Sequence, residues 1–219
     1  MNFHIITAFP KMISPVLEES MLKRAIKSGL INVKIYDLRD HSHNKHKKID
    51  SRPYGGGPGM VLGAEPILRA HKEAKGRKKK TLTILLTPNG KQFNNKYAKD
   101  LSRKYKDIII ICGHYEGIDA RVEKILKPVK LSIGPFILTG GELAALAIVD
   151  STSRYLPGVL GNENSLEETR YATDQVYTRP EKLKWKDKNY KVPDVLLTGH
   201  HKNIEEWHKK QNEKRNKES

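Results

Sequence analysis

The sequence contains a single cysteine and no long apolar run. Cys112 is the only cysteine among 219 residues, which excludes an internal disulfide and suits a reducing compartment. Its place after an isoleucine-rich strand favours a small buried residue over a nucleophile. No stretch reaches the ~18 apolar residues that a transmembrane helix requires, and Met1–Pro10 lacks the features of a signal peptide. We therefore expect a cytoplasmic protein without a membrane span.

Acidic residues are also scarce. Asp and Glu number 25 against 41 Lys and Arg, which gives a formal net charge of +16 and a pI of about 9.8. Hydrophobic residues still make up 37% of the chain, enough for one sizeable core and a small second domain. The composition predicts a basic globular protein whose natural partner is a polyanion. Nucleic acid fits that description better than a membrane surface.

Three segments consist of an apolar strand followed by a loop rich in glycine or proline. The loops lie at Thr87–Gly90, Gly113–Asp119 and Ile133–Leu138. Open α/β sheets bind ligands at the carboxyl ends of their strands, so these loops are predicted to form one site. They contain few charged side chains and suit an adenine-like ring held by main-chain groups. No Gly-x-Gly-x-x-Gly motif is present, which argues against a conventional Rossmann cofactor site.

The rest of the first 160 residues also alternates between strands and helices. Strands are predicted at Phe3–Phe9 and Asn32–Leu38, and helices at Val16–Ser28, Glu65–Lys75 and Gly141–Leu156. In the last helix, Leu143, Leu146 and Ala147 are expected to form a buried stripe. The alternation predicts βαβ units and an α/β fold with a mostly parallel sheet.

The character of the chain changes after residue 160. Residues 161–176 are polar, mostly acidic and without clear periodicity, which predicts a linker or a loop. Residues 177–219 form a short basic region with Trp185 and Trp207 and a charged helix from about Asn203 to Lys217. We therefore predict three parts: a ligand-binding domain over 1–160, a linker over 161–176 and a small, mainly helical domain over 177–219.

Two motifs have an ordinary interpretation beside a functional one. The glycine loop Gly55–Gly59 lacks the Lys-Ser/Thr of a nucleotide P-loop. It is either a tight turn or bare backbone that a flat base or a cofactor can approach. The group His41, His43 and His46 resembles a metal site only weakly, because cysteine and carboxylate ligands at a suitable spacing are absent. Contact with RNA phosphates or with solvent is favoured, and no metal site is predicted.

Five titratable residues are candidates for chemistry, each with an ordinary alternative: Glu116, Arg154, Glu167, Glu168 and Asp174. Glu116 could be an acid at a helix N-terminus, where the helix dipole stabilises it, and Arg154 a cation at a helix C-terminus. Glu167 and Glu168 could belong to a solvated acidic loop. If these residues lay together in one pocket, the ordinary explanations would be less convincing.

Several glycine-rich blocks, in order along the whole chain, resemble the bacterial tRNA (guanine-N1)-methyltransferases. The blocks are Arg52–Met60, Cys112–Asp119, Ser132–Gly134, Gly140–Leu143, Pro157–Gly161, Tyr177–Pro180 and Val192–Gly199. The resemblance implies the SPOUT superfamily, whose α/β sheet is tied in a C-terminal trefoil knot. It also implies a homodimer that binds tRNA and S-adenosylmethionine and methylates N1 of guanine 37, next to the anticodon.

The resemblance assigns roles to particular residues. The cofactor-binding residues that it implies are Leu86, Pro88, Gly90, Gly113, Ile133, Gly134, Pro135, Phe136, Ile137, Leu138, Gly140 and Gly141. Pro58, Gly59, Tyr115 and Arg154 are implied for the target base. Glu168, Arg154 and Glu116 are implied for catalysis.

The sequence departs from the family pattern at three places. The loop after Gly161 is short, so an ungapped comparison puts Thr169 at the position of the family's catalytic aspartate, and a shift of one residue puts Glu168 there. We predict Glu168 as the general base, with Glu167 and Asp174 as alternatives. Pro135 replaces a residue that is usually acidic, and the C-terminal domain is short. Two other functions stay open: methylation of another RNA position, and non-catalytic RNA binding.

Overall fold

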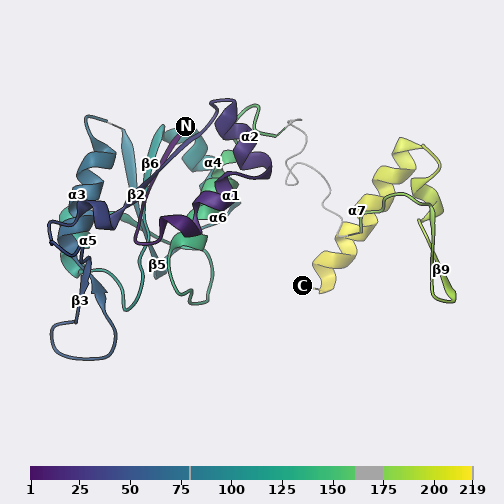
Figure 1. Cartoon of the computed structure of the whole chain (residues 1–219). Coiled ribbons are helices and arrows are strands. Elements are labelled where there is room, and N and C mark those ends of the chain that lie inside the picture. The colour runs from purple at the N-terminus through teal and green to yellow at the C-terminus, as the bar shows by residue number, and fades with distance from the viewer. Residues whose placement is uncertain (79, 161–174, 219) are drawn as a thin grey trace. The chain divides into compact units, whose positions relative to one another are not determined.

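The computed structural model describes residues 1–78, 80–160 and 175–218, with side chains as far as residue 211 (Figure 1). Two compact units are present, Met1–Gly161 and Asn162–Ser219. Glu167, Glu168, Thr169 and Asp174 lie outside the described residues.

A five-stranded, all-parallel sheet forms the centre of the first unit. The strands are β1 (Asn2–Thr7), β2 (Asn32–Asp37), β5 (Thr81–Gln92), β6 (Asp107–Ile111) and β7 (Val129–Ser132), in the spatial order β2-β1-β6-β5-β7. The predicted α/β fold with a mostly parallel sheet is therefore confirmed. The trefoil knot that the resemblance implies does not follow from this strand order and stays a prediction.

Helices cover both faces of this sheet (Figure 1). One face carries α1 (Ser14–Leu17), α2 (Ser20–Lys27), α4 (Asn95–Lys104) and α6 (Glu142–Ser153), and the other carries α3 (Ala64–Lys75) and α5 (Ala120–Leu126). The short elements of the unit are η1 (Pro10–Met12), η2 (Leu38–His41), β3 (Asp50–Ser51) and β4 (Val61–Leu62), the last two forming an antiparallel pair.

The isoleucine run of β6 contributes to both hydrophobic layers, because successive strand residues point to opposite faces. Ile108 and Ile110 pack on the side of α2, α4 and α6. Ile109 and Ile111 pack on the side of α3 and α5. All four are fully buried, which explains why this strand is apolar without interruption. Cys112, the residue after it, is buried as well, as predicted.

Three local predictions were wrong. The helix expected at Val16–Ser28 is two helices, since Glu19 is extended and Ser20 has a φ of 51°. Leu143 does not belong to a buried stripe, because 53% of it is exposed, whereas Leu146 is buried. Helix α6 is enclosed on several sides, so its burial does not follow a simple stripe. The strand β5 runs through the predicted loop Thr87–Gly90 and bulges there.

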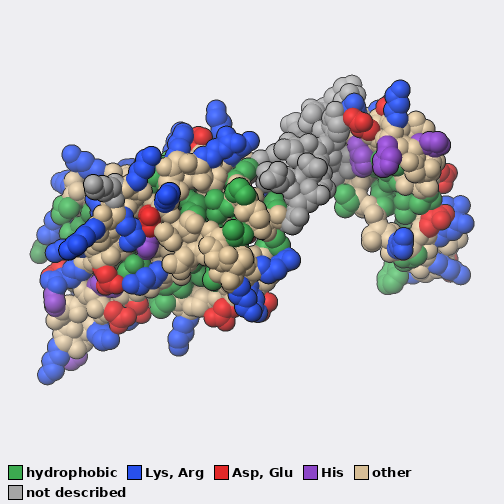
Figure 2. All heavy atoms as spheres, turned by 90° about the horizontal axis from the view of Figure 1, so that it is seen from above, with side chains coloured by type: hydrophobic (Ala, Val, Ile, Leu, Met, Phe, Trp, Pro, Cys, Tyr) green, Lys and Arg blue, Asp and Glu red, His purple; other side chains and the backbone are tan. Residues whose placement is uncertain are grey.

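The second unit contains a β-hairpin as well as helices. Its elements are β8 (Lys182–Trp185), β9 (Lys188–Lys191), η5 (Asp194–Leu196) and α7 (His201–Glu218), and β8 pairs with β9 in antiparallel fashion. Lys and Arg side chains are spread over the visible surfaces of both units (Figure 2). Within the described parts of the chain, no helix has the length and apolar character needed to cross a membrane.

Candidate active site

The predicted loops after β6 and β7 meet the bulge at Thr87–Gly90 in β5, and together they enclose a cleft of about 500 Å³. That volume falls within the range of small-molecule sites. The cleft-lining residues that the resemblance assigned to a cofactor are Leu86, Pro88, Gly113, Ile133, Phe136, Ile137, Leu138, Gly140 and Gly141. Loops far apart in the sequence converge because parallel strands end at the same edge of the sheet.

Three of the residues assigned to the cofactor do not line this cleft: Gly90, Gly134 and Pro135. Gly90 closes the bulge of β5 against β7, since a Cβ built there would lie 2.5 Å from the carbonyl carbon of Leu131. Gly134 is held by Ser132, whose hydroxyl donates to its carbonyl at 2.9 Å and accepts from its N–H at 3.3 Å. These two glycines therefore shape the walls of the cleft.

Part of the cleft wall is apolar. Leu86 lines the cleft and is buried in the core, against which Ile133 and Leu138 also pack. Phe136 and Ile137 are 53% and 85% exposed. Flat apolar walls beside the backbone of Gly113, Gly140 and Gly141 suit an aromatic ring that is recognised by main-chain groups.

The glycine loop before β4 touches the loop after β6. Gly59 has a φ of 78°, and a Cβ built there would lie 2.5 Å from Glu116 Oε1, so a larger residue would be both strained and in collision with that carboxylate. The Glu116 N–H donates to the Met60 carbonyl at 3.0 Å, and the Leu62 N–H donates to the Gly117 carbonyl at 3.0 Å. At Gly59 the loop therefore approaches the cleft closely, beside Glu116.

Glu116 is not the acid at a helix N-terminus. Helix α5 begins at Ala120, and its N-cap is Asp119, whose side chain accepts from the Arg121 N–H at 2.9 Å. The Arg121 side chain also donates to this carboxylate and lowers the pKa of Asp119. Glu116 is instead a residue of the cleft wall, and so is Tyr115, at a φ of 57°.

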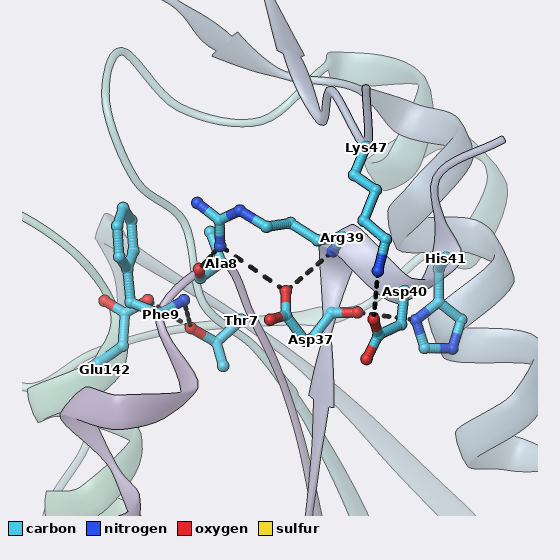
Figure 3. A network of polar contacts seen from close by, with 9 residues as sticks. All are labelled: Thr7, Ala8, Phe9, Asp37, Arg39, Asp40, His41, Lys47 and Glu142. Atoms are coloured by element: carbon cyan, nitrogen blue, oxygen red, sulfur yellow. Dashed lines mark hydrogen bonds and ion pairs between the residues drawn. The ribbon is translucent and has the colours of Figure 1, made fainter. Parts of the chain in front are cut away.

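The remaining candidates are not part of the cleft wall. Arg154 is half-buried at the C-cap of α6, as its position in the sequence predicted. Pro58 belongs to the loop that touches Glu116, without lining the cleft itself. His41 binds the Asp37 carbonyl at 2.9 Å and Glu73 at 3.0 Å, which places it in a polar network with its neighbours (Figure 3). Among the described residues, no group of three or more His, Cys, Asp and Glu could hold a metal ion.

Several polar residues in or beside the cleft were not predicted from the sequence: His114, Glu123 and Lys130 line it, and Glu142 lies beside His114. Glu142 is fully buried. Glu142 is part of the Gly-Gly-Glu block, in which a role was predicted for Gly140 and Gly141 but not for the acid. A charged residue in the first turn of a helix is ordinarily exposed, so nothing in the local sequence indicated its burial.

A parallel α/β sheet with a glycine-walled cleft at its carboxyl edge defines a protein that binds a ligand at that edge, and the basic surface is typical of proteins that act on nucleic acids. The family model for tRNA (guanine-1)-methyltransferase TrmD matches residues 1–219. The chain therefore belongs to the tRNA (guanine-1)-methyltransferase family and is a methyltransferase.

Individual relatives agree with the family assignment. The tRNA (guanine-N(1)-)-methyltransferase of Clostridioides difficile is 45% identical over 96% of this chain and 92% of its own length. The one from Mycoplasma capricolum is 46% identical over 96% of this chain and 86% of its own. The crystal structure of tRNA (m1G37) methyltransferase from Aquifex aeolicus is 42% identical, with a TM-score of 0.78 over 94% of this chain and 87% of that one.

Proposed function

We propose that this protein transfers a methyl group from S-adenosylmethionine to N1 of guanine 37 in tRNA. The observation that carries the proposal is the contact between two sites: the apolar, glycine-walled cleft and the loop of Gly59 that lies against Glu116 at its edge. The relatives' names specify guanine N1, and the name of the Aquifex aeolicus enzyme specifies position 37. The formal net charge of +16 suits a tRNA substrate.

The cleft is suited to the cofactor by its chemistry. Leu86, Ile133 and Leu138 would pack on the faces of an adenine ring, and the backbone at Gly113 and Gly140 would meet its polar edge. S-adenosylmethionine supplies an already activated methyl group. The main task of the protein is therefore to hold donor and acceptor in line. Gly90, Gly134 and Pro135 would act only through the shape of the loops.

Guanine N1 carries a proton at neutral pH and is a poor nucleophile until that proton leaves. We assign its removal to Glu168, because Thr169 has no useful basicity and glutamate reaches further than aspartate across a shortened loop. Negative charge then grows on O6, where the paired donors of Arg154 would stabilise it. Glu116, with Tyr115, Pro58 and Gly59, would form the pocket for the target base.

The whole assembly is proposed as a homodimer in the cytoplasm, where residues 161–176 of one protomer lie over the cofactor of its partner. Exposed apolar side chains at Phe136, Ile137 and Leu143 support an interface in this part of the first unit. The hairpin and helix of the second unit carry many lysines and would contact tRNA phosphates.

Methyl transfer to defined tRNA transcripts tests the proposal. We expect about one methyl group per unmodified transcript that carries guanine at position 37, and none on a matched transcript with adenine there. Nuclease digestion followed by mass spectrometry should identify 1-methylguanosine at that position. Methylation at another nucleotide would identify a different RNA target. Tight tRNA binding without methyl transfer would instead identify a non-catalytic RNA-binding protein.

A further inference from the structure

Glu142 is a buried carboxylate of which only one oxygen has a hydrogen-bond partner among the described residues. Its exposed fraction is 0%. Oε1 accepts from the Thr7 hydroxyl at 2.6 Å, and the same hydroxyl accepts from the Phe9 N–H at 2.8 Å (Figure 3). Oε2 is buried, and the described part of the chain offers it no hydrogen bond. A buried acceptor without a partner is costly, so a donor within reach of Oε2 would stabilise the folded protein.

His114 also has a buried polar atom without a hydrogen-bond partner among the described residues, and it lies next to this oxygen. Its Nδ1 is 3.6 Å from Glu142 Oε2 and is likewise buried without a hydrogen bond to any described residue. The imidazole packs on the rings of Phe9 and Tyr115, with centroids 4.4 Å and 4.8 Å away. A movement of about half an ångström would bring the two atoms to hydrogen-bond distance, so each is the natural partner of the other.

The pair lies where two loops of the cleft meet. His114 and Gly140 form an antiparallel backbone bridge, and the Gly141 N–H donates to the Gly113 carbonyl at 2.8 Å. A Cβ built at Gly140 would collide with both His114 Nδ1 and Glu142 Oε2. The absence of a side chain at this position is therefore what allows the imidazole and the carboxylate to approach.

We infer that Glu142 is a positioning residue for methyl transfer, which holds His114 with its proton on Nδ1 and thereby fixes the loop Gly113–Gly117. An ionised carboxylate can only accept hydrogen bonds, so the ring nitrogen beside it must carry the hydrogen, and this selects the tautomer. Glu142 is in the first turn of α6, where the helix dipole favours an anion. The loop that it fixes carries Glu116 against Gly59.

The variant Glu142→Gln tests this inference with little change of shape. The introduced amide would still accept from Thr7, but its NH₂ group would donate to Nδ1, so the proton of a neutral His114 would move to Nε2. We expect ¹⁵N spectra of histidine-labelled protein, with the His114 signal assigned by its loss in His114→Gln, to change from the Nδ1–H to the Nε2–H pattern. We also expect kcat to fall on the order of tenfold because the loop is displaced, with a smaller change in KM for S-adenosylmethionine.

Two further comparisons separate positioning from packing. His114→Gln keeps a donor for the carboxylate and should retain more activity than His114→Phe, which keeps a ring and removes both nitrogens. Glu65→Gln is the matched control: Glu65 is also in the first turn of a helix, but it is exposed and paired with Arg69, so neither the tautomer nor kcat should change.

Three outcomes would overturn the inference. One is a His114 that is already in the Nε2–H form in the wild-type protein. Another is a tautomer that does not respond to Glu142→Gln. The third is equal activity in His114→Gln and His114→Phe, which also decides the matter if Glu142→Gln does not fold. All variants are compared with wild-type methyl transfer, so a wild-type protein without activity would contradict the proposed function. The tautomer of His114 is measured without turnover and would still test the contact with Glu142.

Discussion

At the scale of single residues, few charged side chains serve the proposed chemistry, and Arg154 is the cation among them. It stands at the end of α6 and does not line the cofactor cleft. A residue in this place can meet the substrate without touching the cofactor. In the proposed role it stabilises mainly the transition state, because negative charge on O6 develops only as the N1 proton leaves.

Arg154→Ala should therefore reduce the rate of methyl transfer much more than the affinity for the cofactor. We expect kcat to fall on the order of 10²-fold, with less than about a threefold change in the dissociation constant of S-adenosylhomocysteine. Single-turnover kinetics and calorimetry measure the two quantities. Arg103→Ala, at an exposed arginine in the last turn of α4, is the control. Equal losses of rate and affinity would make Arg154 a structural residue.

At the scale of elements, the contact between α3 and β5 contains a buried histidine. His71 is on the inner face of α3, and its Nε2 is 2.9 Å from the Thr83 hydroxyl of β5. Burial lowers the pKa of His71, and the charge of Lys75, one helical turn away, lowers it further. The folded protein therefore favours the neutral imidazole, which can share a hydrogen bond with the hydroxyl inside the sheet–helix interface.

The sign of the pH effect follows from proton uptake. Unfolded His71 binds a proton near its ordinary pKa of about 6.5, whereas the folded form resists protonation until a lower pH. The unfolded state thus holds more protons in this window, and the free energy of unfolding falls as the pH drops below about 6.5.

His71→Gln should lose part of this pH dependence, because glutamine does not titrate. Urea denaturation at about pH 7.5 and about pH 5.5, on either side of the ordinary histidine pKa, measures the difference. We expect the wild-type protein to lose more stability between these values than the variant. His43→Gln, at an exposed histidine, should behave like the wild type. The interpretation would be wrong if the His71 and His43 variants responded alike.

At the scale of the whole molecule, exposed apolar side chains are found on both sides of the sheet. Leu143, at the start of α6, is 53% exposed, and Ile125, on α5, is 60% exposed. The two helices cover opposite faces (Figure 1). Leu143 directly follows Gly140, Gly141 and Glu142 at the start of α6, close to the cleft wall, where Phe136 and Ile137 add further exposed apolar surface.

A homodimer formed through this surface should dissociate in Leu143→Asp and not in Ile125→Asp, since a buried carboxylate in an apolar interface is strongly unfavourable. Sedimentation velocity at micromolar concentration measures the mass. We expect methyl transfer to fall together with dimer content, on the order of tenfold or more, because a composite site loses its positioning when the protomers separate. A wild-type protein that is monomeric at this concentration and fully active would contradict the composite site.

The sequence by itself determined the class of fold and the place of the cleft. The run Ile108–Ile111 predicts a buried strand and the glycine-rich segment after it predicts a loop, whatever the rest of the fold. Runs of β-branched residues are buried in parallel sheets, and glycines permit sharp turns. Order and spacing of the glycine-rich blocks then indicated the family. These are local properties, and local chemistry encodes them.

Tertiary structure decided which side chains are buried and which atoms face one another. Glu142 looked like an ordinary acid at the start of a helix, and Gly90 and Gly134 looked like residues that line the cleft. The packing of the helix against β1 buries the first beside His114, and the bulge of β5 turns Gly90 toward β7. Such outcomes depend on contacts between segments far apart in the sequence, where no local propensity acts, so only the folded chain specifies them.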